Sequence, residues 1–314
     1  MKLSIITVSF NTRELLEQRL RSVQLYPPTV SFEEIVVDNG STDKSPEMVA
    51  ERFPNVRLIR NEENRGFAAA NNQGLQMATG EFVLFLNSDT ELLPASLDPL
   101  VMYLESNPTV GVVGPKEQTG DGIPYPTICP FPDLPFLFLT HTGLRHRFYK
   151  NRMINPYRRL WEKARLTGEP TVVDWLSGAS LMVRRKVLDE VGFFDERYFF
   201  YMEETDLCKR ARAAGWLVVF VPTAVIIHHG GQSEGKVRRG LLSLSGTLGE
   251  LYYFRKHRST FALFLLRCLL SAEFCLKLLL TKRNDPRRWA YREVLGAVLG
   301  LRLAQITKED LCQR

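Results

Sequence analysis

Four strand-and-helix units follow one another in the first 106 residues of this 314-residue chain, and this alternation limits its fold more than any other feature. In each unit a short run of apolar, β-branched residues comes before a segment whose apolar residues have helical spacing. Strands are expected at 3–9, 34–37, 56–60 and 81–86, and helices at 14–23, 46–53, 67–77 and 95–106. The pattern predicts an α/β fold with a mostly parallel sheet and helices on both of its faces.

Polar residues stand at the ends of three of these strands. Asn11 follows the first strand, Asp38 ends the second and Asp89 follows the fourth. Ligands of open parallel sheets bind at the carboxyl ends of the strands. We therefore expect these three residues to lie at one site.

The rest of the chain changes character twice. A Pro-rich, aromatic and then basic stretch predicts a long, partly helical insertion at 115–170. We predict one large domain, 1–239, whose halves 1–114 and 171–239 flank the insertion, and a helical region, 240–314. Within the second half the expected strands are 171–173, 179–183, 217–221 and 224–227, and the expected helices are 186–191 and 203–214.

Composition excludes a disordered or low-complexity chain, since 45% of the residues are apolar and 24% are charged. Lys and Arg number 41 against 35 Asp and Glu, and this net charge of +6 suits phosphate-bearing substrates, an anionic membrane or nucleic acid. Five cysteines form no CxxC pair, and the apolar run at the N-terminus is too short for a secretion signal. We expect a cytoplasmic protein.

Residues 261–280 are mostly apolar but are interrupted by Arg267, Glu273 and Lys277. Charges at these depths disfavour a membrane-spanning helix. On a helix the three charges share a sector of about 120°. Two interpretations stay open: an amphipathic helix at a membrane surface, with basic residues from Lys282 onward beside it, or a helix packed on the protein's own core.

Each candidate site residue has a structural alternative. Asp89 could bind Mg²⁺ or Mn²⁺ together with a diphosphate, or it could cap the next helix. Asp38 could accept hydrogen bonds from a base or a ribose, or it could serve only the following turn. Arg65 and the amides around Gly66 could face a phosphate, while the alanines after them could simply permit close helix packing.

Acidic residues open the helix at 203–214. A carboxylate of this cluster, at 203, 204 or 206, could act as a general base, whereas Glu203 is better explained as an acid that complements the helix dipole. His228 and His229 end a strand beside two glycines, where one of them could bind a metal or a phosphate, or serve the structure alone.

The order of these motifs is more specific than any one of them. In sequence they are SFN, VVDNGSTD, NRGFAAANN, NSDT, WLSGA, FFYMEETDLC and HHGGQS. Over residues 3–257 this order resembles family 2 of the glycosyltransferases, inverting nucleotide-sugar enzymes with the GT-A fold, and within it the rhamnosyltransferase-like branch that builds bacterial surface polysaccharides. The resemblance implies a Rossmann-like GT-A domain with a nucleotide-sugar-binding half, 1–114, and an acceptor and catalytic half, 171–239.

The resemblance also implies roles in binding the donor. Asp38 would hold the nucleoside. The residues around the base and the donor would be Thr7, Ser9, Asn11, Arg65, Gly66 and Asn72. Asp89 would be the metal-binding carboxylate of a DxD motif that reads Asn87-Ser88-Asp89 here, without the first aspartate, as is usual in this branch. His228, with His229 second, would join a divalent metal, Mg²⁺ or Mn²⁺, and the diphosphate.

On the acceptor side the resemblance places the general base at Glu204, where Asp is usual, with Asp206 as the runner-up beside Glu203. The sugar and the acceptor would be lined by three residues of the WLSGA segment, Trp175, Gly178 and Ala179. The base would take a proton from the acceptor hydroxyl as it attacks the anomeric carbon.

The implied function is transfer of a sugar, with dTDP-rhamnose or a UDP-sugar favoured as donor, to a polysaccharide or lipid-linked saccharide. The enzyme would then be peripheral on the inner face of the cytoplasmic membrane, and a homo-oligomer stays open. A second hypothesis is an inactive nucleotide-sugar-binding or scaffold protein on the same fold. A nucleotidyltransferase is disfavoured because VSFNTRELL has no glycine-rich loop, and a nucleic-acid binder because the basic residues cluster near hydrophobic helices.

Overall fold

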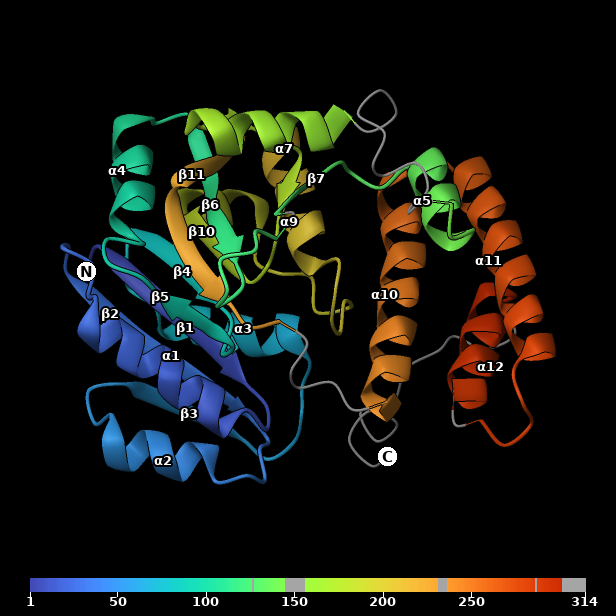
Figure 1. Ribbon diagram of the computed structural model, residues 1–314, viewed down its shortest axis with the longest axis horizontal. Coiled ribbons are helices and arrows are strands. Elements are labelled where there is room, and N and C mark those ends of the chain that lie inside the picture. The colour runs from blue at the N-terminus through green and yellow to red at the C-terminus, as the bar shows by residue number, and fades with distance from the viewer. Residues whose placement is uncertain (126, 145–155, 231–235, 286, 301–314) are drawn as a thin grey trace. The chain divides into compact units, whose positions relative to one another are not determined.

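The computed structural model describes residues 1–125, 127–144, 156–230, 236–285 and 287–300, without the side chains of 156–158 and 236–243 (Figure 1). The chain forms two compact units. The sheet unit comprises 1–131, 159–197 and 204–233, and the helical unit comprises 132–158, 198–203 and 234–314. The helical unit thus includes three segments of the predicted large domain, 132–158, 198–203 and 234–239, while the domain boundaries themselves stay a prediction.

The sheet unit is built on a nine-stranded sheet within the described residues, ordered β3-β2-β1-β4-β10-β6-β11-β5, with β8 paired to β11. Its strands are β1 (Leu3–Ser9), β2 (Phe32–Asn39), β3 (Arg57–Asn61), β4 (Phe82–Leu86), β5 (Thr90–Leu92), β6 (Val110–Gln118), β8 (Thr171–Val172), β10 (Ser180–Arg184) and β11 (Leu217–His228). A separate pair joins β7 (Ile128–Cys129) to β9 (Trp175–Leu176).

The helices of the sheet unit are α1 (Arg13–Leu25), α2 (Ser45–Arg52), α3 (Phe67–Met77), α4 (Asp98–Ser106), α7 (Pro156–Thr167), α8 (Arg185–Val191) and α9 (Glu203–Ala213). The division into units cuts two of these helices: residues 156–158 of α7 and Glu203 of α9 belong to the helical unit. The helical unit otherwise consists of α5 (Leu134–His141), α10 (Lys236–His257), α11 (Thr260–Leu280) and α12 (Arg287–Val298).

The sheet is parallel across β3, β2, β1 and β4, as the alternation predicts. Strand β10 then runs antiparallel between β4 and β6, so the second half of the sheet is mixed. The two strands expected at 217–221 and 224–227 are one strand, β11, whose pairing with β6 shifts register between Val221 and Val225. An irregularity of this kind bends a strand without ending it.

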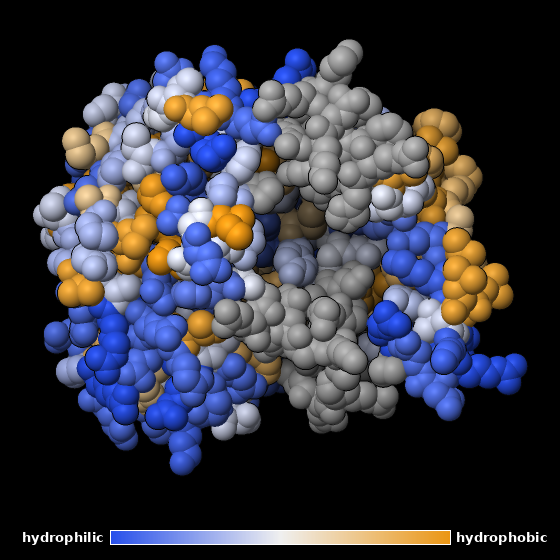
Figure 2. All heavy atoms as spheres, in the orientation of Figure 1, coloured by the Kyte–Doolittle hydropathy of each residue, from blue (hydrophilic) through white to orange (hydrophobic). Residues whose placement is uncertain are grey.

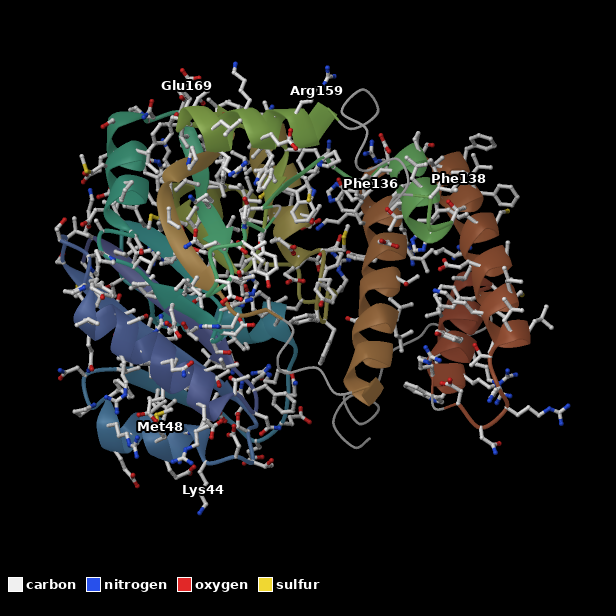
Figure 3. All side chains as sticks on the ribbon, in the orientation of Figure 1. Lys44, Met48, Phe136, Phe138, Arg159 and Glu169 are labelled. Carbon is white, nitrogen blue, oxygen red and sulfur yellow. The ribbon has the colours of Figure 1, made fainter. Side chains whose placement is uncertain are left out.

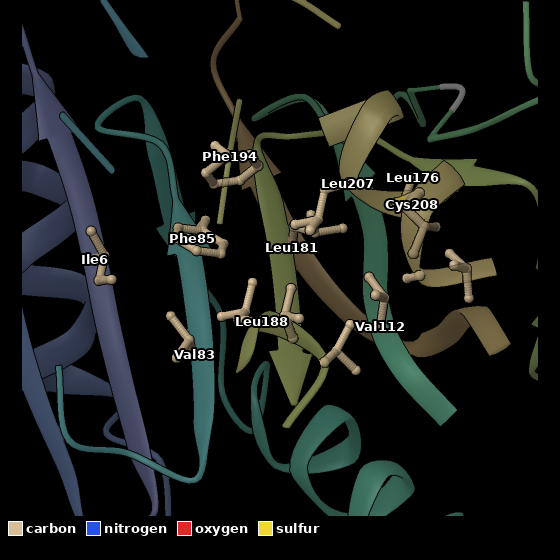
Figure 4. Close-up of a cluster of buried hydrophobic side chains, with 14 of the residues drawn as sticks. Ile6, Val83, Phe85, Val112, Leu176, Leu181, Leu188, Phe194, Leu207 and Cys208 are labelled. Atoms are coloured by element: carbon tan, nitrogen blue, oxygen red, sulfur yellow. The ribbon is translucent and has the colours of Figure 1, made fainter. Parts of the chain in front are cut away.

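Alternation along β4 explains the two-sided core. Val83 and Phe85 point to one face and Phe82, Leu84 and Leu86 to the other, because successive side chains of a strand alternate. Helices α3, α8 and α9 contribute to the first cluster, part of which Figure 4 shows, while α4 contributes to the second. The sheet is thus buried on both faces, and its polar groups are offered at the strand ends.

The helical unit has a hydrophobic core of its own. Its largest buried side chains, Tyr198, Tyr253, Phe254 and Phe274, come from the loop before α9 and from α10 and α11. None of the helices in the described residues combines the length and the apolar character that crossing a bilayer requires.

Candidate active site

The ends of β1 and β2 are tied together by the side chain of Asn11. Its Oδ1 accepts a hydrogen bond from the backbone amide of Thr42 (2.8 Å), and the backbone amide of Asn11 donates to the hydroxyl of Ser41 (3.0 Å). Asn11 has a positive φ of 53°, which asparagine tolerates better than most residues. Parallel pairing sets Ser9 opposite Asp38, so these loops leave the same edge of the sheet.

Asp38 is the buried acid of this edge, with 2% of its surface exposed. Its Oδ2 accepts from the amide of Ser41 (3.0 Å), while Oδ1 is buried and has no hydrogen-bond partner among the described residues. Burial raises the pKa of this carboxyl above its usual range. An uncompensated buried acceptor is costly, so a donor group of a ligand is a natural partner for it.

The turn after Asp38 requires glycine at position 40. Gly40 has a φ of +82°, and a Cβ there would lie 2.8 Å from the carbonyl carbon of Glu63. The NG pair therefore allows the β2 loop to pass directly over the segment that leads to α3.

Two other residues expected near the base, Thr7 and Ser9, are fully buried in β1. The Ser9 hydroxyl lies 3.0 Å from that of Thr12, which donates to Ser88 (3.0 Å). Through Thr12 the β1 loop is thus joined to the Asn87-Ser88-Asp89 loop, and Ser88 is 9% exposed.

The loop before α3 exposes the Arg65 side chain, while asparagine side chains hold the backbone of the loop. The amide of Arg65 donates to Asn39 Oδ1 (3.0 Å), and the amide of Gly66 donates to Asn64 Oδ1 (2.9 Å). Asn72, expected beside the donor, is buried, and its side chain exchanges two hydrogen bonds with the backbone of Phe194. Asn72 therefore connects α3 to the loop before α9.

Asp89 lies at the point where β4 ends and β5 begins. Antiparallel pairing of β11 with β5 sets His228 opposite Thr90, which places the imidazole beside Asp89. His228 Nε2 lies 3.5 Å from Asp89 Oδ1, and the backbone amide of His229 donates to the Asp89 carbonyl (2.8 Å). Two residues that are far apart in the sequence are thus brought together by strand pairing alone.

Glu117 on β6 completes this arrangement, although no local pattern in the sequence singles it out. It is 2% exposed, and its Oε2 lies 3.0 Å from His228 Nδ1. Burial opposes protonation of His228, but the carboxylates of Asp89 and Glu117 outweigh it and raise the pKa of the imidazole to about 10. The ring of Tyr125, also missed, lies 5.5 Å from the His228 ring.

His229 takes part in a different contact. Its Nε2 lies 2.8 Å from Glu91 Oε1 on β5. The two adjacent histidines therefore have separate carboxylate partners, and His228 is the one that faces Asp89.

The donor atoms here suit a metal that is held jointly with a substrate. No group of three or more His, Cys, Asp or Glu side chains that could hold a metal ion occurs within the ranges described. Asp89 and His228 supply one carboxylate and one imidazole, and Mg²⁺ commonly takes one or two carboxylates plus substrate phosphates and water. The pair therefore fits a metal–diphosphate site. Asn87 adds a buried Oδ1 that has no hydrogen-bond partner among the described residues.

The WLSGA segment links this loop to the start of α9. The Ala179 carbonyl accepts from the amide of Asn87 (2.9 Å), and the Trp175 indole donates to the Pro130 carbonyl (2.7 Å). A Cβ at Gly178 would lie 3.4 Å from Cγ of Glu204. Gly178 thus lies directly against the Glu204 side chain, on the same strand-end edge as Asp89.

The three acids of α9 have different surroundings. Asp206 is fully buried, and its Oδ2 accepts from Arg210 Nε (2.7 Å). Arg210 also donates to the backbone carbonyls of residues 191, 192 and 193, so this pair fastens α9 to the end of α8. Glu204 is 8% exposed beside Gly178, and Glu203, 4% exposed, belongs to the helical unit.

The backbone before α9 is strained. Tyr201 and Met202 have φ values of 72° and 77°, and each such non-glycine residue costs about 1–3 kcal/mol. Within the helical unit, Ser245 on α10 donates to the Phe200 carbonyl (2.8 Å). Gly249, one turn further along α10, leaves the room that the strained pair occupies, since a Cβ there would lie 3.0 Å from Tyr201 O and Met202 Cγ. No local pattern in the sequence singles out Ser245 or Gly249.

Comparison with known proteins adds a family to this geometry. The family model described as Glycosyl transferase family 2 matches residues 4–192. A protein of Mycobacterium tuberculosis named N-acetylglucosaminyl-diphospho-decaprenol L-rhamnosyltransferase is 34% identical to this chain over 248 residues, which cover 74% of this chain and 78% of that protein. These matches confirm the family and the rhamnosyltransferase-like branch expected from the motifs.

Solved structures agree in fold. The mannosyltransferase PcManGT from Pyrobaculum calidifontis, in complex with GDP-Man and Mn²⁺, superposes with a TM-score of 0.55 at 20% identity, covering 99% of this chain and 83% of that one. GalNAc-T7 with UDP, GalNAc and Mn²⁺ gives 0.55 at 17% identity, covering 82% of this chain and 51% of that one. The α/β, GT-A fold class is thereby confirmed.

Proposed function

The chain belongs to glycosyl transferase family 2, and on that premise we propose that it moves a sugar from a nucleoside-diphosphate sugar to a hydroxyl group of a saccharide acceptor, with inversion at the anomeric carbon. Glycosyltransferase activity is supported by the family match, by the M. tuberculosis relative and by the solved neighbours. The donor and the mechanism are our proposal.

One observation carries this proposal: a single edge of the sheet brings together a buried acid, a carboxylate–imidazole pair and a glutamate. Asp38, Asp89 with His228, and Glu204 beside Gly178 all lie at the ends of strands or next to them. These groups are of the kinds needed to hold a nucleoside, to neutralise a diphosphate and to accept a proton.

We assign the nucleoside to the β1–β2 edge. The buried Asp38 Oδ1 can accept a hydrogen bond from a ligand. The imide N–H of a uracil or thymine base can donate it, and so can a ribose hydroxyl. Arg65 is exposed on the neighbouring loop, where its guanidinium can meet a phosphate or a base.

We assign the diphosphate to Asp89 and His228. A divalent metal, Mg²⁺ or Mn²⁺, would be held by the Asp89 carboxylate and the His228 imidazole, and when bound it supplies positive charge next to the phosphate oxygens. Binding of the metal requires the neutral imidazole, with Nε2 free to ligate and Nδ1 held by Glu117.

We assign the general base to Glu204. As the acceptor oxygen bonds to the anomeric carbon, the bond from that carbon to the diphosphate oxygen breaks on the opposite face, and Glu204 takes the proton of the acceptor hydroxyl. Single displacement inverts the configuration. The Asp206–Arg210 pair supports this choice over Asp206, because Asp206 is fully buried and already serves the packing of α9.

The proposed donor is dTDP-rhamnose or a UDP-sugar, and the proposed acceptor is a lipid-linked or polysaccharide hydroxyl. The support is the name of the M. tuberculosis relative, which specifies rhamnosyl transfer to a diphospho-decaprenol-linked N-acetylglucosamine. Action on such an acceptor would place the enzyme at the inner face of the cytoplasmic membrane in the cell-envelope pathway.

A second candidate function is favoured by two residues. Asn87 occupies the first acidic position of the DxD motif, and Glu204 stands where an aspartate is usual. A nucleotide-sugar-binding scaffold without catalytic activity would retain the donor site but not turnover.

Calorimetric titration with dTDP, UDP and GDP, each with and without Mn²⁺, tests the donor site. We expect one nucleotide to bind in a Mn²⁺-dependent manner, and Asp89→Ala to abolish the Mn²⁺ dependence. A transfer assay with the matching donor then separates the two candidates, since binding without turnover identifies the scaffold. Failure of every nucleotide to bind would overturn both.

A further inference from the structure

Helix α11 turns its charged side inward. Two of the charges that interrupt its apolar sequence, Glu273 and Lys277, form an ion pair of 2.6 Å, and the Lys277 ammonium lies over the rings of Phe274 and Tyr291. Glu273 also contacts His141 Nδ1 of α5 (2.7 Å). These charges are therefore neutralised within the helical unit.

The buried apolar residues of α11 lie in the same sector as these charges. Leu266, Leu270 and Phe274, at most 1% exposed, recur every four residues and contribute to the core of the helical unit. At 100° per residue, this buried row and the charged residues all fall within one side of the helix. The opposite side carries no partner among the described residues.

That opposite side is apolar along the whole helix. We call it the outer face of α11. Its residues are Phe261, Phe264, Leu265, Cys268, Ala272, Cys275, Leu276 and Leu279, all exposed. Phe261 is 68% exposed and Leu279 82%. In Figure 2 hydrophobic residues gather on the right-hand edge, over the helix that Figure 1 labels α11.

The outer face extends beyond α11 at its sides and at its end. Phe138 of α5, which packs beside α11, is 49% exposed (Figure 3). At the C-terminal end Leu280 is 77% exposed and is followed by the exposed Lys282 and Arg283. The 21 residues of α11 give a stripe about 30 Å long.

Basic residues are in excess in this part of the helical unit. The sequence between 244 and 300 holds ten Lys and Arg residues against four Asp and Glu residues. Of the acids, Glu250 and Glu273 face His141, and Asp285 pairs with Arg287. Exposed positive charge is left at Arg267 of α11, at Lys282 and Arg283, which follow the C-terminal end of α11, and at Arg292 of α12.

We propose that the outer face of α11 binds an anionic lipid bilayer, lying in the plane of its surface. An apolar stripe flanked by Lys and Arg has the complementarity that such a surface requires, because the apolar side chains enter the acyl boundary while the basic ones meet lipid headgroups. A second copy of the chain would bury the same apolar residues, but it would bring like positive charges together. Charge therefore favours the bilayer.

Membrane binding would hold the enzyme beside a lipid-linked acceptor, and so it deepens the proposed function. Only this biological role rests on the proposed function; the binding itself does not. Binding to lipid is measured without any donor, acceptor or turnover. Failure of transfer and failure of membrane binding are therefore separate results.

Cosedimentation with vesicles of phosphatidylcholine alone, or mixed with phosphatidylglycerol, tests the proposal. We expect the full chain to bind the anionic vesicles and to be released by high salt. Phe264→Ser with Leu279→Ser should lower the partition coefficient at least about tenfold. Leu25→Ser with Met102→Ser is the matched control, since these exposed residues belong to the sheet unit, at 68% and 63% exposure.

A second variant pair separates the electrostatic contribution. Lys282→Glu with Arg283→Glu should remove the preference for anionic vesicles, whereas the exposed pair Lys163→Glu with Arg165→Glu on α7 should retain it. All these positions are exposed, so thermal melting should be little changed. Wild-type protein that ignores anionic vesicles at low salt, or outer-face variants that bind as well as wild type, would overturn the proposal. A third result would also overturn it: wild-type protein that binds no lipid but sediments as a dimer, with the dimer lost in the outer-face variant.

Discussion

Glu117 and His228 are 111 residues apart in the sequence, yet the carboxylate of the first lies 3.0 Å from Nδ1 of the second. Strand β11 pairs in parallel with β6 and antiparallel with β5, so it delivers the imidazole between two acids. Glu117 contacts one ring nitrogen and Asp89 faces the other. In this geometry Glu117 fixes the orientation of His228, as carboxylates do behind metal-binding histidines.

Glu117→Gln therefore tests a positioning residue. It preserves the shape of the side chain but removes the charge that orients the imidazole. We expect the affinity for the nucleotide in the presence of Mn²⁺ to fall about tenfold or more, and the affinity without Mn²⁺ to change little. Calorimetry gives both values. Glu91→Gln is the control, because Glu91 pairs with His229. Equal Mn²⁺-dependent affinities in wild type and Glu117→Gln would refute the role.

Glu204→Gln tests the general base. With Gly178 against its side chain, Glu204 can be replaced by the isosteric amide without a steric change. We expect donor binding to be retained while kcat falls by about 10²–10⁴. Single-turnover transfer and nucleotide titration measure the two effects.

Asp206→Asn is expected to act differently. It weakens the buried pair with Arg210 and leaves that guanidinium partly uncompensated, so unfolding free energy should fall by about 3 kcal/mol or more. Denaturant unfolding measures this loss. If Glu204→Gln transfers normally and Asp206→Asn is stable but inactive, the assignment of the base is wrong.

Gly249→Ala and Gly246→Ala form a matched pair on α10. A methyl group at 249 would lie 3.0 Å from the Tyr201 carbonyl oxygen, whereas at 246 the nearest atom is a Tyr201 ring carbon at 3.6 Å. Alanine favours helix by about 1 kcal/mol over glycine. Gly246→Ala should therefore stabilise the protein or leave it unchanged, and Gly249→Ala should displace the loop before α9, destabilise it and lower kcat. Thermal unfolding and a transfer assay report these effects. Identical behaviour of the two variants would show that close packing at 249 does not hold the loop.

Stability of the helical unit should decrease in mild alkali. His141 lies between Glu250 and Glu273, at 2.8 and 2.7 Å, and although burial opposes protonation these carboxylates raise the pKa of the imidazole to about 9, from a usual 6.5. The extra stability is fully present below pH 6.5, and it is lost as the pH rises through about 9. A shift of this size corresponds to at most about 3 kcal/mol.

Denaturant unfolding at pH 6.5, 8 and 9.5 measures this effect. A spectroscopic probe placed in the helical unit reports the unfolding of that unit. We expect wild type to lose stability over this interval and His141→Gln to be less stable at pH 6.5 with a flatter profile. Parallel profiles for the two proteins would contradict the role of His141.

The first half of the sheet could be predicted because its signals are local. Strand β1 and helix α3 occupy the residues that the apolar periodicity assigned to them, 3–9 and 67–77. In a parallel sheet the positions of Asn11, Asp38 and Asp89 at strand ends follow directly from that alternation. Identifying Glu117, Tyr125 and Gly249 was not possible in this way, because each matters only through a contact with a distant part of the chain.

Local spacing also could not show which acidic side chains are already engaged in structural contacts. Asp206 and Glu204 are two residues apart on one helix, but Arg210 fixes the first to the end of α8, while the second lies against Gly178. The Asn72 side chain, expected beside the donor, also holds the backbone of Phe194, a contact that no local pattern indicates. These roles depend on how α3, α8 and α9 pack on the sheet.

The sequence alone determined that α11 has a charged side and an apolar side, because 100° per residue distributes Glu273, Lys277 and the leucines in a fixed way around any helix. Only the tertiary structure decided which side faces out. Ion pairs with His141 and within α11 stabilise the charges on the inside, and the apolar outer face remains exposed as a result.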